Sequence, residues 1–295
     1  MKFQAMKDHE ADYPIAFMCR AFDVSKSGYY EWLSKTKNRD EKAKQEQKLA
    51  VTIEAIHLGS KRKYGSPNVT PILQGLGFDL SQSTVARRMK KHGIRSKLKR
   101  KFKATTDSDH KLPVAPNLLM QDFTAYRPDQ IWMSDITYVH AREGWLYVCA
   151  IIDLFSKKIV SWTASCRMTQ DLVIATFLKA YRDRSPNQNL IFHSDRGSQY
   201  ASRAFRHLLR RLGVLQSMSR RACCWDSAPI ESFWGRLKTE CVFWEDFAKR
   251  EDALHVIRDW IESDYNLTRP HSSIERMSPN QFEEQFTLAS QAVNE

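Results

Sequence analysis

Three strand-like runs follow one another within residues 130–165 and restrict the chain to folds built around a sheet. The runs are rich in Ile, Val, Tyr and Trp, and turns at 142–144 and 156–158 separate them. Helical and strand-like patterns then alternate: a helix over 170–184, a strand over 190–192, a helix over 202–212, a strand over 214–218, and helices from Pro229 onward. This order predicts an α/β domain in which helices flank a mixed five-stranded sheet.

The N-terminal part of the chain carries helical patterns instead. Residues 14–34 predict a short helix, a turn and a second helix, and residues 38–57 predict a separate solvated helix. Residues 63–94 have the features of a helix–turn–helix, in which two glycines break the chain and Ser81 or Ser83 caps the last helix. That basic helix suits the major groove of DNA or the phosphates beside it, and its predicted DNA contacts are Arg87, Arg88, Lys90 and Lys91.

Positive charge is concentrated in the same part of the chain. The formal net charge is +12, and residues 1–112 hold 24 Lys and Arg against 12 Asp and Glu, whereas residues 113–295 hold 22 of each kind. This asymmetry favours a nucleic-acid-binding arm attached to a neutral domain over basic helices that only keep the chain in solution. Residues 95–117 form a basic linker, for which phosphate contacts and simple solvation both remain open. The linker residues predicted to bind DNA are Lys99, Arg100 and Lys101.

The compartment is indicated by what the sequence lacks. No run of 18 apolar residues occurs, and the N-terminus has no apolar centre of the kind found in signal peptides. The six cysteines form no CxxC pair, so we expect reduced thiols and no zinc site. These features predict a cytoplasmic protein with no membrane partner.

Three acidic residues lie where strands or helices could carry them into one cleft. Asp135 stands mid-strand in WMSDITYV, where an acid is costly unless a partner or a metal compensates its charge. Asp195 follows the strand over 190–192, at the end where α/β sheets tend to hold ligands, and Glu231 lies in the first turn of the next long helix. Converging carboxylates suit hard divalent ions such as Mg²⁺. Spacing alone does not show that the three acids meet, and each taken singly could have a structural role.

Several motifs follow one another along the chain, each occurring once: CRAFDVSKSGYYEWL, KYGSPNV, WMSDITYV, GWLYVCAIIDLFSKKIVSW, HSDRGSQY, CWDSAPIESFWGRLKTE and YNLTRPHSSIERMSPNQF. In these motifs the chain resembles the second-frame transposase of the IS3 insertion-sequence family, within the DDE transposase and retroviral integrase superfamily. Between Asp195 and Glu231 lie 35 residues, the spacing that names the family's signature, and Lys238 stands where the family has a basic residue. The resemblance covers nearly the whole chain.

The resemblance implies an RNase H-like catalytic domain that acts on DNA ends. It implies that Asp135, Asp195 and Glu231 are catalytic and bind two Mg²⁺ ions, for which Mn²⁺ can substitute. Water would nick the element's end, and the freed 3′-hydroxyl would attack another phosphodiester. The implied partners are terminal-repeat DNA, target DNA, further copies of the chain on that DNA, and the upstream-frame (OrfA) protein as a partner or fusion. The residues implied to contact DNA in this domain are His193, Arg196 and Lys238.

One loop departs from the family pattern. Residues 221–226 read RACCWD, whereas the family has Gly and Asn after the basic residue. Asp226 is retained, and we expect it to cap the following helix. We also expect Asp153, which follows the second strand, to serve the structure and not the reaction.

Together these patterns predict five parts: a helical segment (1–58), a helix–turn–helix-like region (59–104), a basic linker (105–126), an RNase H-like catalytic core (127–286) and a tail (287–295). Two alternatives to a transposase remain. An RNase H-type nuclease would cut DNA without joining it, and a helix–turn–helix regulator would bind DNA without metal-dependent chemistry.

Overall fold

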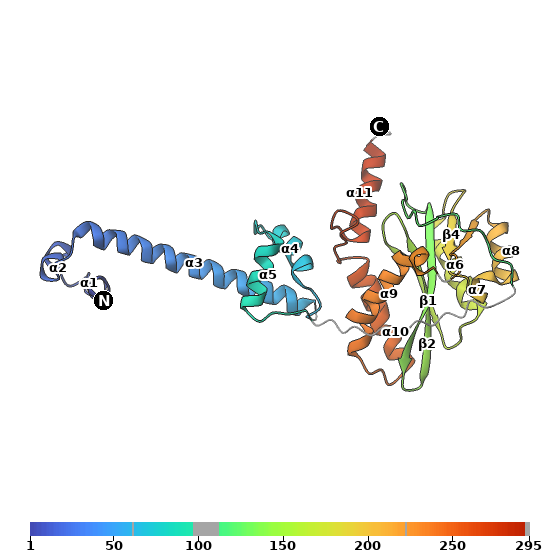
Figure 1. The fold of residues 1–295 in the computed structure, drawn as a ribbon, viewed down its shortest axis with the longest axis horizontal. Helices are drawn as coiled ribbons and strands as arrows, with labels where there is room; N and C mark the ends of the chain where they lie inside the picture. Colours follow the sequence, from blue (N-terminus) through green and yellow to red (C-terminus); the bar gives the residue numbers. More distant parts are fainter. Residues whose placement is uncertain (61, 97–111, 222, 293–295) are drawn as a thin grey trace. The chain divides into compact units, whose positions relative to one another are not determined.

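The computed structural model describes residues 1–60, 62–96, 112–221 and 223–292. The chain divides into two compact units, Met1–Lys97 and Leu98–Glu295, coloured blue to teal and green to red in Figure 1. In the described part of the chain, no helix has the length and apolar character needed to cross a bilayer.

The first unit is helical and has two small apolar cores. One core lies at the start of the longest helix and includes Met6, Met18 and Tyr29, and the other lies at its end and includes Ile53 and Leu73. The helices are α1 (Lys2–Asp8), α2 (Ile15–Ala21), α3 (Lys26–Gly59), α4 (Ser66–Gly75) and α5 (Gln82–Lys91).

Helix α3 runs unbroken over 34 residues. The prediction of two separate helices in this stretch was therefore wrong. Ser25 starts α3 by accepting a hydrogen bond from the Gly28 N–H at 3.0 Å. No Gly or Pro occurs between Tyr29 and Leu58, and the Lys, Glu, Gln and Ala residues of this stretch favour a helix. Nothing in the sequence ends the helix between the two predicted segments.

The predicted helix–turn–helix is present as α4, a turn and α5. Helix α4 ends at Gly75, and Gly77 adopts a φ of 87°, a conformation that favours glycine. The side chain of Ser81 caps α5, as expected, and Val85 is buried against α3 and α4.

The second unit is built on the mixed five-stranded sheet that the sequence predicts. Its strands are β1 (Ile131–Ala141), β2 (Gly144–Asp153), β3 (Ile159–Ser165), β4 (Ile191–Ser194) and β5 (Leu215–Met218), in the spatial order β3-β2-β1-β4-β5. Strand β2 is antiparallel to both β1 and β3, whereas β1, β4 and β5 are mutually parallel. This sheet with flanking helices has the predicted RNase H-like architecture.

Helices cover both faces of the sheet, and an apolar core lies on each side. One core gathers Met133 and Ala150 of the sheet with Phe233 and Leu237, and the other gathers Trp132 and Phe192 with Phe177. In Figure 1 the helices of the first core are orange and those of the second are yellow. They are α9 (Ala228–Glu240) and α10 (Arg250–Asp259) on one face, and α6 (Gln170–Arg184), α7 (Ser198–Ala201) and α8 (Arg203–Arg211) on the other, followed at the C-terminal end by α11 (Pro279–Ala292).

Candidate active site

The register of two parallel strands brings Asp135 and Asp195 together. Ser134 of β1 pairs with Ser194 of β4, so each aspartate follows its paired serine at the same level of the sheet. Neighbouring strands lie about 4.8 Å apart. Side chains alternate between the faces of a strand, and Met133 packs on the face covered by α9. Asp135, two residues farther on, therefore belongs to that same face.

Strand β4 ends at Ser194, and the chain then turns tightly around Asp195. The Gly197 N–H donates a hydrogen bond to Asp195 Oδ1 at 2.9 Å. A Cβ atom on Gly197 would lie 3.0 Å from the same carboxylate oxygen. The lack of a side chain at Gly197 therefore lets the turn close around the carboxylate.

Glu231 approaches from helix α9. It lies in the first turn of that helix, where its own side chain is exposed. The neighbouring Ile230, Phe233 and Trp234 are buried against the sheet and fix the helix over the face that carries Asp135. The three acids that the sequence singles out thus come from β1, from the end of β4 and from α9.

The charges of these acids affect one another. Burial, then repulsion from Asp195 and more weakly from Glu231, raises the pKa of Asp135 to about 8, although the Ile136 N–H and the Trp234 indole oppose the rise. Burial also raises the pKa of Glu231. Acids held this close need a cation if all are to be ionised at neutral pH.

The three carboxylates do not yet form one ligand cluster. Among the residues that the structure describes, no group of three or more His, Cys, Asp or Glu side chains is placed so that it could hold a metal ion. Asp135 and Asp195 directly follow the last paired residues of β1 and β4, whereas the side chain of Glu231 is exposed.

His193 does not fit the predicted DNA contact. Its side chain is fully buried, and Nδ1 shares a hydrogen bond with Ser217 Oγ of β5 at 2.8 Å. Burial lowers the pKa of His193 to about 4, so the ring is neutral at physiological pH. A buried, neutral ring offers nothing to a phosphate, so we correct its role to joining β4 with β5.

Arg196 directly follows Asp195, and Lys238 lies on the helix that bears Glu231. Arg196 is half-buried, and its Nε donates to the Ser219 carbonyl oxygen at 2.7 Å, which ties the turn after β4 to the end of β5. Lys238 is on the same helix as Glu231, and its Nζ lies 5.4 Å from the centre of the Tyr138 ring. This distance is within the range of a cation–π interaction.

The basic residues predicted in the first unit separate into two groups. Arg87 and Lys90 are exposed on α5, whereas Arg88 and Lys91 form ion pairs with Glu46 of α3. Lys99, Arg100 and Lys101 lie outside the described residues.

Asp153 takes the structural role that we expected. It is fully buried, and its carboxylate accepts hydrogen bonds from the backbone N–H groups of Asp129, at 2.6 Å, and of Phe155, at 2.7 Å. It pairs with Trp132, whereas Asp135 pairs with Ala150, so the two acids lie at different levels of the sheet.

Asp226 does not cap α9, contrary to expectation. Ser227 precedes the helix, and no side chain makes a capping hydrogen bond there. The carboxylate of Asp226, 1% exposed, instead binds Arg220, whose backbone N–H and Nη2 both donate at 2.8 Å. Asn117 Nδ2 and Gln121 Nε2 also donate to it, at 2.9 and 3.1 Å. These bonds hold the pKa of Asp226 well below its usual range, with the Arg220 side chain as the largest cause.

This buried carboxylate fastens the loop before α9 to residues 117–121, and sequence reasoning missed it. The spacing of Arg220 and Asp226 in the sequence does not indicate that their side chains interact. Asn117 lies 109 residues from Asp226 in the chain. A single sequence contains no signal that pairs such distant residues.

Replacing Asp226 by Asn is expected to lower the free energy of unfolding by about 2 kcal/mol, because several charge-assisted hydrogen bonds lose their acceptor. The loop that precedes α9 should also become more mobile. Urea denaturation measures the change. The matched control is Asp246→Asn, which removes an exposed carboxylate paired with Arg142 and should alter stability little. Equal effects of the two substitutions would contradict the assignment.

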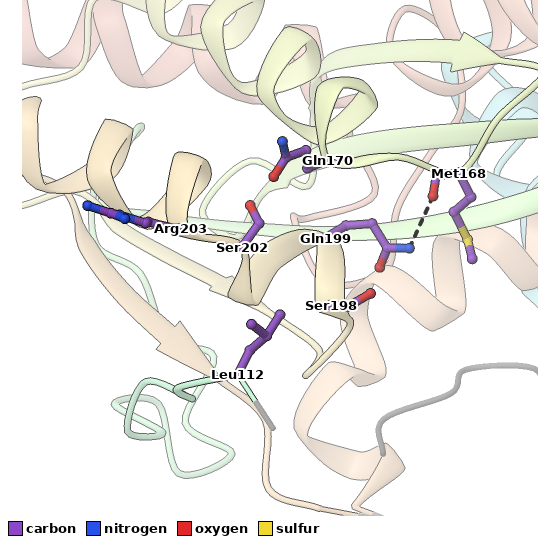
Figure 2. Close-up of a pocket in the computed structure, with 7 residues that line it drawn as sticks. All are labelled: Leu112, Met168, Gln170, Ser198, Gln199, Ser202 and Arg203. Carbon is purple, nitrogen blue, oxygen red and sulfur yellow. Dashed lines mark hydrogen bonds between the residues drawn. The ribbon is translucent and has the colours of Figure 1, made fainter. Parts of the chain in front are cut away.

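A hollow of about 410 Å³ lies beside the turn after Asp195 but contains none of the three acids. Figure 2 shows the Gln199 side chain donating a hydrogen bond to the Met168 carbonyl oxygen at its wall, at 3.3 Å. Hydroxyl and amide groups with one arginine supply no acid or metal ligand, so we do not place the reaction there. The lining residues are Leu112, Met168, Gln170, Ser198, Gln199, Ser202 and Arg203.

Comparison with known proteins gives consistent matches along the chain. Two models described as integrase core domain match residues 125–224 and 212–279, and a model described as HTH-like domain matches residues 44–102. A simian T-cell lymphotropic virus intasome structure aligns with a TM-score of 0.47 at 16% identity, over 78% of this chain and 74% of that chain.

Two curated relatives match almost end to end. The insertion element IS600 uncharacterized 31 kDa protein of Shigella sonnei is 40% identical over 269 residues, which is 91% of this chain and 98% of that protein. Transposase InsF for insertion sequence IS3A of Escherichia coli (strain K12) is 38% identical over 283 residues, which is 96% of this chain and 98% of that protein. With this identity over nearly its whole length, the chain belongs to the IS3 family of insertion-sequence transposases, enzymes of the DDE transposase and integrase class.

Proposed function

We propose that the chain cleaves DNA at the ends of its insertion sequence and joins the freed 3′-hydroxyl to a second phosphodiester, with Asp135, Asp195 and Glu231 as the catalytic acids. The observation that carries the proposal is that Asp135 and Asp195 directly follow the paired Ser134 and Ser194 of β1 and β4, on the side of the sheet covered by the helix that bears Glu231. The reaction takes place on chromosomal or plasmid DNA in a prokaryotic cytoplasm.

The acids fit a divalent metal. Their donor atoms are all carboxylate oxygens, and burial together with repulsion from Asp195 raises the pKa of Asp135, both of which a hard cation would offset. These acids would hold two Mg²⁺ ions, or Mn²⁺ in their place, and the bound metal would supply activation of the attacking oxygen and stabilisation of the leaving one. Asp135 and Asp195 hold their positions on the sheet, and Glu231 completes the set from α9. Lys238, on the same helix, is proposed to bind a DNA phosphate.

The positive charge of the first third of the chain supports DNA binding outside the catalytic unit. Arg87 and Lys90 of α5 and the linker residues Lys99, Arg100 and Lys101 are proposed to bind DNA. We further propose that several copies of the chain act together on terminal-repeat and target DNA, and that the upstream-frame (OrfA) protein takes part as a partner or fusion.

The function is tested with labelled duplex DNA that carries the element's end, incubated with Mg²⁺ or with EDTA. Nicking and joining that require Mg²⁺ are expected. Cleavage without joining would favour an RNase H-type nuclease. Binding without any reaction, also when the chain is fused to the upstream-frame protein, would favour a regulator.

Metal binding has a readout that needs no DNA. Mg²⁺ should stabilise the fold by relieving the repulsion between Asp135 and Asp195, by about 2.7 kcal/mol at 100 times its dissociation constant. The midpoint of thermal unfolding should rise with Mg²⁺ in the parent protein and stay constant in Asp135→Asn. A rise of the same size in both would show that the ion binds elsewhere.

A further inference from the structure

Glu46 of helix α3 binds two of the four basic residues on α5. The Arg88 Nη1 donates to Glu46 Oε1 at 2.8 Å, and the Lys91 Nζ donates to the same oxygen. Arg88 and Lys91 are one helical turn apart and therefore share the side of α5 that faces α3. One carboxylate thus forms ion pairs with two basic side chains of α5. The same helix contributes Val85 and Met89 to the apolar core.

The remaining surface of α5 has a different composition. Ser83, Arg87 and Lys90 are exposed at spacings of four and three residues, which places them in one row along the helix. Gln82 and Ala86, also exposed, lie beside that row. Arg87 is oriented by Thr84, whose hydroxyl accepts from Nη2 at 3.4 Å.

This composition suits the edges of base pairs. Arginine pairs with guanine and glutamine with adenine through two hydrogen bonds in the major groove, serine bonds to either, and alanine contacts the thymine methyl group. The groove is wide enough for an α-helix. Phosphate contacts, in contrast, carry no direct sequence information and add to non-specific binding.

We infer that α5 reads base edges in the major groove of duplex DNA through Gln82, Ser83, Ala86 and Arg87, and that Glu46 withholds Arg88 and Lys91 from the phosphates. The inference rests on the proposed function only in taking the element's end as the duplex that is read. Charge complementarity supports this partner, because Arg87 and Lys90 are exposed and residues 1–112 hold twice as many basic as acidic residues. Glu46 thereby limits non-specific binding and raises the ratio of specific to non-specific affinity.

The test measures DNA binding by the full-length protein in EDTA, so that cleavage has no part in the result. Fluorescence anisotropy compares a duplex of the element's end with a scrambled duplex of equal length and composition, over a range of salt concentrations. Glu46→Gln should bind the scrambled duplex more tightly, and its slope of log affinity against log salt should steepen by about 1–2. Glu41→Gln, the same substitution at an exposed position of α3, is the matched control. It should change neither the affinity for the scrambled duplex nor the salt slope.

A second variant tests base reading separately. Arg87→Lys keeps the positive charge but loses the fork that makes two hydrogen bonds. It should weaken binding to the element's end about 5- to 150-fold and leave binding to the scrambled duplex unchanged. Because Arg87 is exposed, the fold should be unaffected.

Three results would overturn the inference. Equal affinity and salt slope for Glu46→Gln and Glu41→Gln would remove the role of Glu46. Arg87→Lys weakening both duplexes equally, or a parent protein that does not distinguish them, would remove base reading by α5. None of these depends on whether the chain cleaves DNA, and a catalytically inert protein that gives the expected binding results would contradict only the proposed reaction.

Discussion

Asparagine at position 135 is expected to lower the rates of DNA cleavage and joining by about 1,000-fold, and glutamine at position 231 should do the same. Each substitution keeps nearly the same shape and removes one charge from the set that would hold the metal. Binding to the element's end should change far less, because it depends on the first unit. Single-turnover cleavage and anisotropy measure the two effects separately.

The same substitution at Asp135 should make the protein more stable when no metal is present. Burial and then repulsion from Asp195 raise the pKa of Asp135 from 3.8 to about 8. A folded-state pKa above the unfolded value means that stability falls as the pH rises through this window, and the loss is largest above it. At pH 7 in EDTA, Asp135→Asn should therefore unfold at a higher temperature than the parent.

Glu284→Gln is the matched control for both measurements, because Glu284 is an exposed acid on α11. It should leave cleavage, joining and thermal stability unchanged. An Asp135→Asn protein that cleaves DNA at the parent rate would show that the acids have been assigned wrongly. One that is inert but less stable than the parent would instead contradict the account of its raised pKa.

The parts of the fold that sequence could predict are those set by local patterns. The bounds of α6 follow from apolar spacing within the helix itself, and the turns between the first three strands follow from their own residues. The position of Asp195 at the end of a strand also follows from the residues of that segment alone. The order of the motifs then led to the prediction that the three acids act together, which stays a prediction.

The parts that could not be predicted depend on partners that are distant in the chain. His193 flanks an aspartate in sequence, yet β5 and its Ser217 enclose it. Asp226 appeared suited to a helix cap, but residues more than 100 positions away bind it. Glu46 and Arg88 are 42 residues apart, so the division of the basic residues of α5 became visible only in three dimensions.

One buried ion pair joins the C-terminal motif YNLTRPHSS to helix α9. Arg269 within it donates through Nη1 to Glu240 Oε2 in the last turn of α9, and both side chains are buried. Arg236 of the same helix is close by, and burial, followed by the charge of Arg269, lowers its pKa. One carboxylate therefore balances the buried Arg269 and lies close to the half-buried Arg236 on the helix that carries Glu231.

Glutamine in place of Glu240 is expected to lower the free energy of unfolding by about 3–5 kcal/mol, because it leaves the buried Arg269 without its counter-charge. Replacing Glu240 and Arg269 together, by Gln and Met, should cost less than the sum of the two single substitutions, since the pair is removed as a unit. Urea denaturation of the four proteins gives the coupling. Additive losses would show that the two side chains do not interact.

Activity separates this structural role from a catalytic one. Glu240→Gln should lose cleavage in proportion to the fraction of unfolded protein, and cooling below its unfolding transition should restore the rate. Glu231→Gln should be folded at the temperatures at which the parent is folded, and cooling should not restore its rate, because it lacks a charge that would bind metal while α9 stays in place. If Glu240→Gln is folded yet inactive, the buried pair must do more than hold the helix, and the position of Glu231 relative to Asp135 would depend on it directly.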